Sequence, residues 1–564
     1  MEKKAILLLS LLIILLLNSN PINMSINHVQ NSLKISGKSA IKLEIASAAS
    51  NHIQIIGKTI VMNKTFVVND TDYVEIINST LDFSNLTTVS TLIENYGTLI
   101  INNSHIISNL NQSYAKVISS TGNLTVIKST FQNKKLLVDF EKRNVTCIIA
   151  IWQSSHWINL HNNYFENYTS AVEIWSSNIE KIYNNTFVNC PFGISLFDTN
   201  NAIIENNMFM NSCAVGISVK GERITIENNY IYNNRNLLLT QSDLFGNPTQ
   251  GIVVQGSSYI HVINNTIINT FKCIAIFNSN NTYVESNEVD TTGPKEGEIQ
   301  AQSSNYLIFR NNIIKNQWDS IEIYNSRHLL IEQNIIENGN TAIRVERVDI
   351  LDGIDPINIT IQYNMITNSG LLNIEHGANV KIMHNLLNKT IFSIRKNTTN
   401  VLILNNTLYS TEIYIETSKN VTTTNNTVEN LENLKFCITK SEIVFINFNI
   451  LKNATFEITD SKNVQITNNT IYTCLGTEVF TQHGYNENII IKNNTIIYIN
   501  EQQETSTGEQ PESPISEQPE NTTAEEAGTP TAPPKNISYQ FLGISSIAGV
   551  ITIAIVVLLL RKRK

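Results

Sequence analysis

An eight-residue pattern of apolar and polar positions recurs along the chain. In its clearest copy, ITIENNYI at residues 224–231, apolar residues stand at positions 1, 3 and 8 and asparagine at position 6. Nineteen copies can be placed, with position 5 at residues 57, 78, 103, 128, 162, 184, 206, 228, 264, 286, 311, 333, 363, 384, 405, 425, 447, 468 and 493. The commonest interval is 22 residues. A period of this size over most of a chain predicts a solenoid.

Each repeat contains short alternating runs and no helical segment. Positions 1 and 3 alternate with polar residues and are mostly β-branched, which predicts a strand. A second alternating run follows, as in AVEIWSS at 171–177 and SIEIYNS at 320–326. Stacked repeats would pair each strand with its equivalent in the next one. The sequence therefore predicts an all-β parallel β-helix of about 19 coils over residues 24–500.

The second asparagine of the pair is the more constrained. From residue 162 onward, position 6 is asparagine in fourteen of fifteen copies, with Phe448 as the exception. Position 5 is looser and takes Ser286, Gln333, Tyr363 and His384. Asparagine tolerates a positive φ angle, and stacked amides can hydrogen-bond along a solenoid axis. We therefore expect position 6 both to make a turn and to form an amide ladder.

The xNNxI/F coil followed by GIxVxxS resembles the right-handed parallel β-helix repeats of pectate-lyase-like and NosD-like proteins, over roughly residues 50–500. The resemblance implies a right-handed solenoid. It implies less about activity, because that fold hosts lyases, hydrolases, epimerases, copper-site maturation proteins and non-enzymatic surface proteins. In SHWINLHNNYF at 155–165, His161 takes the place of the aspartate in the pectate-lyase WIDH element. The ten histidines are scattered and suggest no copper cluster.

Both ends of the chain carry membrane signals. Residues 1–23 combine two lysines with an apolar run, as in a signal peptide or N-terminal anchor. Residues 501–536 are rich in Glu, Pro, Thr and Ser and predict a disordered stalk. Residues 537–560 predict a single transmembrane helix, and the basic residues 561–564 predict a cytoplasmic tail. We expect a protein of the cell membrane with most of the chain outside the cell.

The composition narrows the list of partners. A net charge of −9 without a basic patch gives no reason to expect nucleic acid. The Ile-rich composition, about two dozen Asn-x-Ser/Thr sequons and a C-terminal anchor with a basic tail resemble an archaeal surface glycoprotein. The partners expected are the membrane, through its single C-terminal span, and carbohydrate.

Two columns of side chains are predicted to face outward from the second strand of the repeat. The first contains Glu173, Ser195, Ser218, Val253, Ala275, Gln300, Glu322, Arg344 and Asn373. The second contains Trp175, Phe197, Lys220, Gln255, Phe277, Gln302, Tyr324, Glu346, Glu375 and Arg395. The aromatic residues of the second column are candidates for sugar stacking or for simple sheet stabilisation. Glu322, Arg344, Glu346 and Glu375 are candidates for acid–base catalysis or for cross-strand ion pairing.

Two smaller sites are also predicted. Asp349, Asp352 and Asp355 could bind Ca²⁺ through their carboxylates or could form an acidic surface loop. Cys190 and Cys213 lie at similar positions in neighbouring coils and could form a disulfide. The function expected is a non-catalytic glycan-binding or envelope protein of the cell surface. The alternative is a polysaccharide lyase or glycoside hydrolase that acts on the outer face of the β-helix.

Overall fold

The computed structural model describes residues 52–499 except 113, 135–137, 140–143, 146–147, 155, 178, 213, 234–248, 292–297 and 350–352. The predicted N-terminal signal, stalk, transmembrane span and basic tail lie outside the described residues. Strands β1 to β56 make up the fold, and the described residues contain no α-helix. Accordingly, no helix within the described ranges has the length and apolarity to cross a bilayer.

The strands form three parallel sheets, named here by their order within each turn. The first sheet precedes the asparagine pair and contains β1 (His52–Ile56), β4 (Tyr73–Ile77), β7 (Thr98–Asn102), β10 (Asn123–Ile127), β15 (Ile158–His161), β18 (Ile179–Tyr183), β21 (Ile203–Glu205), β24 (Thr225–Glu227), β27 (Ser258–Ile263), β30 (Asn280–Glu285), β33 (Asn305–Arg310), β36 (Arg327–Glu332), β39 (Ile357–Gln362), β42 (Ala378–Met383), β45 (Thr399–Leu404), β48 (Lys419–Thr424), β50 (Glu442–Asn447), β52 (Lys462–Thr467) and β55 (Ile490–Lys492).

The second sheet follows the asparagine pair with shorter strands. It contains β2 (Thr59–Val61), β5 (Thr80–Asp82), β8 (His105–Ser108), β11 (Thr130–Asn133), β16 (Tyr164–Glu166), β19 (Thr186–Val188), β22 (Met208–Met210), β25 (Tyr230–Tyr232), β28 (Thr266–Ile268), β31 (Glu288–Asp290), β34 (Ile313–Lys315), β37 (Ile335–Glu337), β40 (Met365–Thr367), β43 (Leu386–Asn388), β46 (Thr407–Tyr409), β53 (Thr470–Cys474), β56 (Thr495–Ile499) and the first parts of β49 (Thr427–Thr439) and β51 (Ile450–Thr459).

The third sheet closes each turn and corresponds to the second run of the repeat. It contains β3 (Phe66–Val68), β6 (Thr91–Asn95), β9 (Ala115–Ser120), β14 (Ile148–Ser154), β17 (Ser170–Trp175), β20 (Phe192–Asn200), β23 (Val215–Glu222), β26 (Gln250–Gln255), β29 (Lys272–Phe277), β32 (Ile299–Gln302), β35 (Asp319–Tyr324), β38 (Thr341–Glu346), β41 (Leu371–Glu375), β44 (Ile391–Arg395), β47 (Ile413–Glu416), β54 (Phe480–His483) and the last parts of β49 and β51.

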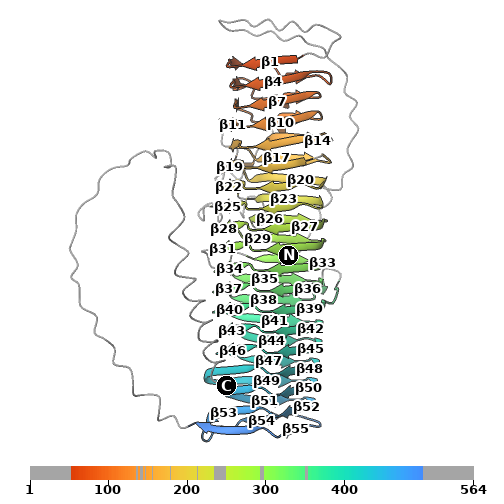
Figure 1. The fold of residues 1–564 in the computed structure, drawn as a ribbon, viewed down its shortest axis with the longest axis vertical. Helices are drawn as coiled ribbons and strands as arrows, with labels where there is room; N and C mark the ends of the chain where they lie inside the picture. Colours follow the sequence, from red (N-terminus) through yellow and green to blue (C-terminus); the bar gives the residue numbers. More distant parts are fainter. Residues whose placement is uncertain are drawn as a thin grey trace, which may run out of the picture. The chain divides into compact units, whose positions relative to one another are not determined.

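Each strand of these sheets pairs in parallel with its equivalent in the next turn, for example β24 with β27 and β35 with β38. The turns stack in the order of the sequence (Figure 1). The exception to the pattern is a short antiparallel pair, β12 (Val138–Asp139) with β13 (Asn144–Val145). The prediction of an all-β parallel solenoid is confirmed, with about 18 turns.

The core is a stack of inward-facing apolar side chains. Ile224, Ile226 and Ile231 of the clearest repeat are completely buried, as the pattern predicts. Identical positions lie above one another, so like side chains pack together. Phe165, Phe187 and Phe209 form one such stack, with centroids 5.1 and 4.7 Å apart. Stacking of this kind buries apolar area in every turn and is the main source of stability of a solenoid.

The two positions of the asparagine pair have different roles, and the turn is not at the position that the sequence predicted. The residue with positive φ is the one at position 5: Asn228 has a φ of 54° and is exposed. The same holds where position 5 is not asparagine, as at Tyr363, with a φ of 57°. Position 5 is therefore the turn residue, and the assignment of the turn to position 6 was wrong. Because its side chain points into solvent, position 5 tolerates many residue types.

Position 6 forms the predicted amide ladder. The side chain of Asn229 is buried, and its Nδ2 donates to Asn265 Oδ1 over 3.0 Å and to the Ile204 carbonyl over 2.9 Å. The backbone N–H of Asn229 also donates to Asn265 Oδ1. The ladder runs through Asn163, Asn185, Asn207, Asn229, Asn265, Asn287, Asn312, Asn334, Asn364, Asn385, Asn406, Asn426, Asn449, Asn469 and Asn494.

Phe448 is not an exception to this ladder. Asn447 pairs with Thr424 and Thr467, the last residues of the flanking strands. This register places Phe448 at position 5, with a φ of 55°, and Asn449 at position 6. The sequence alignment was one residue out of register in this turn because Asn447 imitates the first asparagine of a pair.

Candidate functional site

The third sheet presents the two predicted outward columns. The register pairs Glu322 with Arg344 and Tyr324 with Glu346, and it continues through the equivalent residues of the neighbouring turns. Although these side chains point away from the core, several are buried by their neighbours: Glu322 is 4% exposed and Glu375 is 7% exposed. Charges held at such low exposure need partners. The face is therefore more than a solvated surface.

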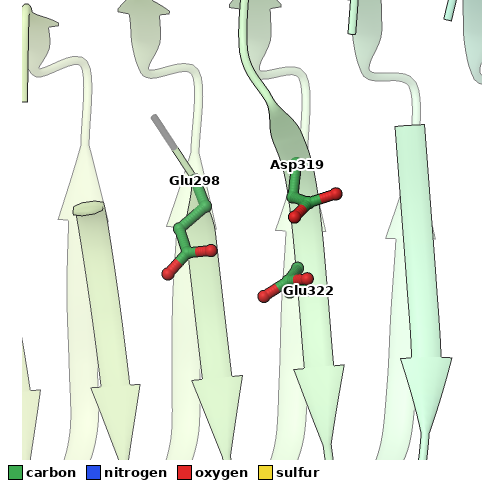
Figure 2. A group of neighbouring side chains, drawn as sticks. All are labelled: Glu298, Asp319 and Glu322. Carbon is green, nitrogen blue, oxygen red and sulfur yellow. The ribbon is translucent and has the colours of Figure 1, made fainter. Parts of the chain in front are cut away.

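Three carboxylates converge in this face. Glu298 directly precedes β32, and Asp319 and Glu322 belong to β35. One oxygen of each lies within 4.8 Å of the other two. Figure 2 shows Asp319 and Glu322 on β35 and Glu298 just before the neighbouring strand β32. We call Glu298, Asp319 and Glu322 the acidic cluster.

Two cations border the acidic cluster. Arg344 on β38 lies 2.9 Å from a carboxylate oxygen of Glu322 and 3.6 Å from one of Asp319. Lys272 on β29 lies 3.0 Å from Glu298. Three acidic and two basic groups leave one negative charge in excess if all are ionised. The carboxylates also offer the oxygen ligands that a hard divalent cation prefers, in competition with Arg344 and Lys272.

The protonation of the acidic cluster reflects this environment. Burial raises the pKa of Glu322, and the neighbouring charge of Glu298 raises it further. Burial also raises the pKa of Asp319. Burial and the charge of Glu322 together raise the pKa of the Tyr324 phenol. Carboxyl groups that hold a proton more readily than usual are suited to donate it.

A second charged group follows in the next turns. Lys396 lies 2.5 Å from Glu375, and Asn373 donates to Glu375 over 3.1 Å. Burial acts to raise the pKa of Glu375, but the hydrogen bonds from Lys396 and Asn373 together with the charge of Lys396 outweigh it and lower that pKa. Burial and the charge of Glu375 raise the pKa of Glu346. Glu375 is thus a stable anion, whereas Glu346 has no such dedicated cation in contact.

The four predicted catalytic residues are brought close together in two adjacent groups along the sheet. Glu322 and Arg344 form one ion pair, and Glu346 and Glu375 adjoin it. Sequence reasoning missed Glu298, Asp319, Lys272 and Lys396, which complete both groups. Glu298 follows an insertion and Lys396 lies in a turn, so neither stands in an alternating run. Asp319 begins the strand that contains Glu322, and this nearness was the one signal available.

The predicted aromatic residues are only partly assembled. Trp175 on β17 and Phe197 on β20 stack with centroids 4.2 Å apart and planes 22° apart. The indole Nε1 of Trp175 is buried and has no hydrogen-bond partner. Phe277 pairs with Gln255 and Gln302 in the register, and Tyr324 is the next residue in the column after Gln302. The column is thus one aromatic stack followed by separate aromatic rings.

Each of the two smaller predicted sites includes a residue outside the described residues. Asp349 and Asp355 both pair with Arg347, over 2.6 and 3.0 Å, and are largely exposed. Asp352 lies outside the described residues. Cys190 is buried, and burial raises the pKa of its thiol to about 12. Cys213 also lies outside the described residues, so the Ca²⁺ loop and the disulfide both remain predictions.

A family model described as "Right handed beta helix region" matches residues 139–289 and 236–387. No curated protein matches the chain in sequence. Similar solved structures include the surface adhesin PfbA of Streptococcus pneumoniae, at 14% identity over 58% of this chain and 84% of that chain, with a TM-score of 0.28. Another is an exopolygalacturonase from Thermotoga maritima, at 12% identity over 70% and 84%, with a TM-score of 0.25.

A third similar structure is a mutant tailspike protein of E. coli bacteriophage HK620 in complex with pentasaccharide. It is 11% identical over 77% of this chain and 74% of that chain, with a TM-score of 0.30. Likenesses at these levels concern the fold and not the activity. The family match and the parallel strand register together identify the chain as a right-handed parallel β-helix protein.

Proposed function

We propose that this protein binds an extended glycan along the outer face of its third sheet, at the cell surface. The observation that carries the proposal is a pair of buried polar atoms on this face that lack hydrogen-bond partners: Trp175 Nε1 and Asn373 Oδ1. Leaving such a group unsatisfied costs about 1–3 kcal/mol, and folded proteins contain few of them. Ligand hydroxyl groups could satisfy both.

The chemistry of the face suits a sugar polymer. The stacked rings of Trp175 and Phe197 offer an apolar surface for the C–H face of a sugar ring. The acidic cluster and Arg344 offer acceptors and a donor for hydroxyl groups. Tyr324 lies six turns from Trp175 in the same column, which corresponds to about 29 Å at a strand spacing of about 4.8 Å. An extended glycan of several residues would reach both.

Display at the cell surface is part of this proposal. The signal at 1–23, the stalk at 501–536 and the span at 537–560 would hold the β-helix outside the membrane. A binding surface on a tethered solenoid can meet glycans of an envelope or of another cell without any catalytic step.

A glycan array probed with the purified full-length chain in detergent tests the proposal. We expect binding to a linear polysaccharide that weakens at least tenfold in Trp175→Ala, because that change removes both the stacking surface and the unpaired indole N–H. The matched control is His261→Ala on the first sheet, where His261 and Tyr283 stack in the same way at 4.6 Å. Equal binding by both variants, or no binding by the unaltered chain, would contradict the proposal.

A second candidate function is glycoside hydrolysis. It is favoured by the close approach of Glu298, Asp319 and Glu322 and by the raised pKa values of Asp319 and Glu322. Retaining glycosidases hold two carboxyl groups roughly 5 Å apart, one as acid and one as nucleophile. Release of reducing ends from a bound glycan, abolished in Glu322→Gln and in Asp319→Asn, would establish this function. Binding without release would leave the face as a binding surface.

A further inference from the structure

The two asparagines of the repeat differ in whether they can accept an N-linked glycan. Where position 7 is threonine, the asparagine at position 5 heads an Asn-x-Thr sequon, whereas the ladder asparagine at position 6 does not. The acceptor asparagines are exposed in the left-handed turn, and the following threonine begins a second-sheet strand. In turns that contain both asparagines, sequons of this type are headed by Asn184, Asn264, Asn405, Asn425, Asn468 and Asn493. We call these six residues the edge asparagines.

Sequons are distributed unevenly around the solenoid. First-sheet strands contain several, headed by Asn102, Asn123, Asn280, Asn358 and Asn420. None of the third-sheet strands β3 to β47 contains a sequon asparagine. The strands β17 to β38, which contain the Trp175–Phe197 stack and the acidic cluster, therefore hold no acceptor, whereas Asn167 and Asn397 head sequons in turns beside this sheet and Asn453 heads one in β51.

The composition of the third-sheet column sharpens this contrast. In seven of the turns from β17 to β47, the last outward residue of the strand is followed two positions later by a serine or threonine, so a single asparagine in its place would create a sequon. Several of these serines form their own hydrogen-bonded ladder, such as Ser257 to Ser279 and Ser279 to Ser304. The residues in the column are instead Trp175, Phe197, Gln255, Phe277, Gln302, Tyr324 and Glu416.

We propose that the edge asparagines are N-glycosylated and that the third sheet is kept free of glycans so that it can bind its ligand. Glycosylation of the edge asparagines requires only that the chain is exported, as in the proposed function. The glycan-free third sheet rests on the proposed function itself, which is ligand binding by that sheet. In the modification, Nδ2 of asparagine attacks the anomeric carbon of a polyprenyl-pyrophosphate-linked oligosaccharide. The new N–C bond replaces the sugar–phosphate bond, the amide loses one proton and the polyprenyl pyrophosphate leaves.

Glycopeptide mass spectrometry tests the first half. The full chain is produced in cells that N-glycosylate secreted proteins, and occupancy is measured at each sequon. We expect glycans on the edge asparagines, and loss of the glycan from Asn405 alone in Thr407→Ala, which keeps both asparagines of that turn. Unmodified edge asparagines would overturn the proposal, whether or not Asn521 in the predicted stalk carries a glycan.

A sequon introduced on the third sheet tests the second half. Gln302→Asn creates Asn-Ser-Ser at a half-exposed position between Phe277 and Tyr324. We expect this variant to acquire a glycan there and to lose array binding at least tenfold, whereas Gln302→Ser, which lacks the acceptor, keeps it. A glycosylated Gln302→Asn chain that still binds would overturn the requirement for a bare face. No binding by the unaltered chain would refute the proposed function but not the occupancy result.

Discussion

The asparagine ladder and the outer face of the third sheet come from the same repeat, but they differ in how completely their polar groups are satisfied. In the ladder, the amide and backbone N–H of Asn229 both reach Asn265, and the pattern repeats from turn to turn. On the third sheet, Trp175 Nε1 and Asn373 Oδ1 are buried without a hydrogen-bond partner, and the three carboxyl groups of the acidic cluster share two cations, Arg344 and Lys272. The ladder, whose polar groups bond to one another, serves to stabilise the fold. The polar groups of the third sheet that lack partners can still bond to a ligand.

Removing one ladder amide should have the largest effect. Asn265→Ala would leave the N–H of Asn229 without its acceptor and would remove the amide that donates to the Ile226 carbonyl. Asn287 Oδ1 would lose one of two donors, because the backbone N–H of residue 265 still bonds to it. We expect a loss of about 3–5 kcal/mol, seen as a lower urea midpoint. The control is Asn264→Gly at the adjacent turn position, where φ is 53° and glycine is tolerated. Similar losses in both variants would mean that the ladder is not what stabilises this edge.

Removing the cation of the acidic cluster should have the next largest effect. Arg344→Met would leave Glu322 and Asp319 without their nearest positive charge. We expect a loss of about 2–4 kcal/mol, because a buried charge without its partner is costly. The double variant Glu322→Gln with Arg344→Met should lose less than Arg344→Met alone, when compared by urea midpoints. If the double variant is less stable than Arg344→Met, the Glu322 carboxylate stabilises the fold in some way other than by pairing with Arg344.

The pH dependence of stability should separate the two charged groups. Folding raises the pKa of Glu322, so the folded state binds that proton more tightly and its stability rises as pH falls through the raised value toward about 4. The pKa of Glu375 is lowered, so its contribution is present above about 4 and is lost as pH falls through the folded value. We expect wild type to gain stability relative to Glu322→Gln between pH 7 and pH 5.

Thermal melts across this range provide the measurement. The matched variant Glu375→Gln should show no comparable change above pH 5, because Glu375 stays ionised there in both folded and unfolded chains. A constant difference between wild type and Glu322→Gln would show that the Glu322 carboxyl does not take up its proton in this interval.

A substitution at position 5, the turn residue of the repeat, should have the smallest effect on stability. Phe448 is 58% exposed and has a φ of 55°, a conformation that asparagine adopts more readily than phenylalanine. Phe448→Asn should therefore raise the free energy of unfolding by about 0.5 kcal/mol, seen as a slightly higher urea midpoint. Asn449→Ala, one residue later, should lose several times that amount. Clear destabilisation by Phe448→Asn would contradict this prediction and would mean that the Phe448 side chain stabilises the fold by packing.

The sequence by itself determined the architecture of this protein. The alternating apolar positions and the 22-residue period require strands that stack in parallel, because only neighbouring turns can bury Ile224, Ile226 and Ile231. The near-constant asparagine at position 6 identified the ladder, since a buried amide must find partners in every turn. The outward columns followed from the two-residue periodicity of a strand and match the observed register.

The tertiary structure alone decided which groups meet. The turn conformation belongs to Asn228 rather than Asn229 because φ is set by how the chain passes between sheets, and both residues are asparagine in this copy. The register of Phe448 depends on strand pairing with the flanking turns. Glu298 joins Asp319 and Glu322 across an insertion of irregular length, so no periodic rule brings it there. The repeating positions of the sequence build the solenoid. The stacking of its turns brings together the residues of the candidate site, which do not follow the repeat.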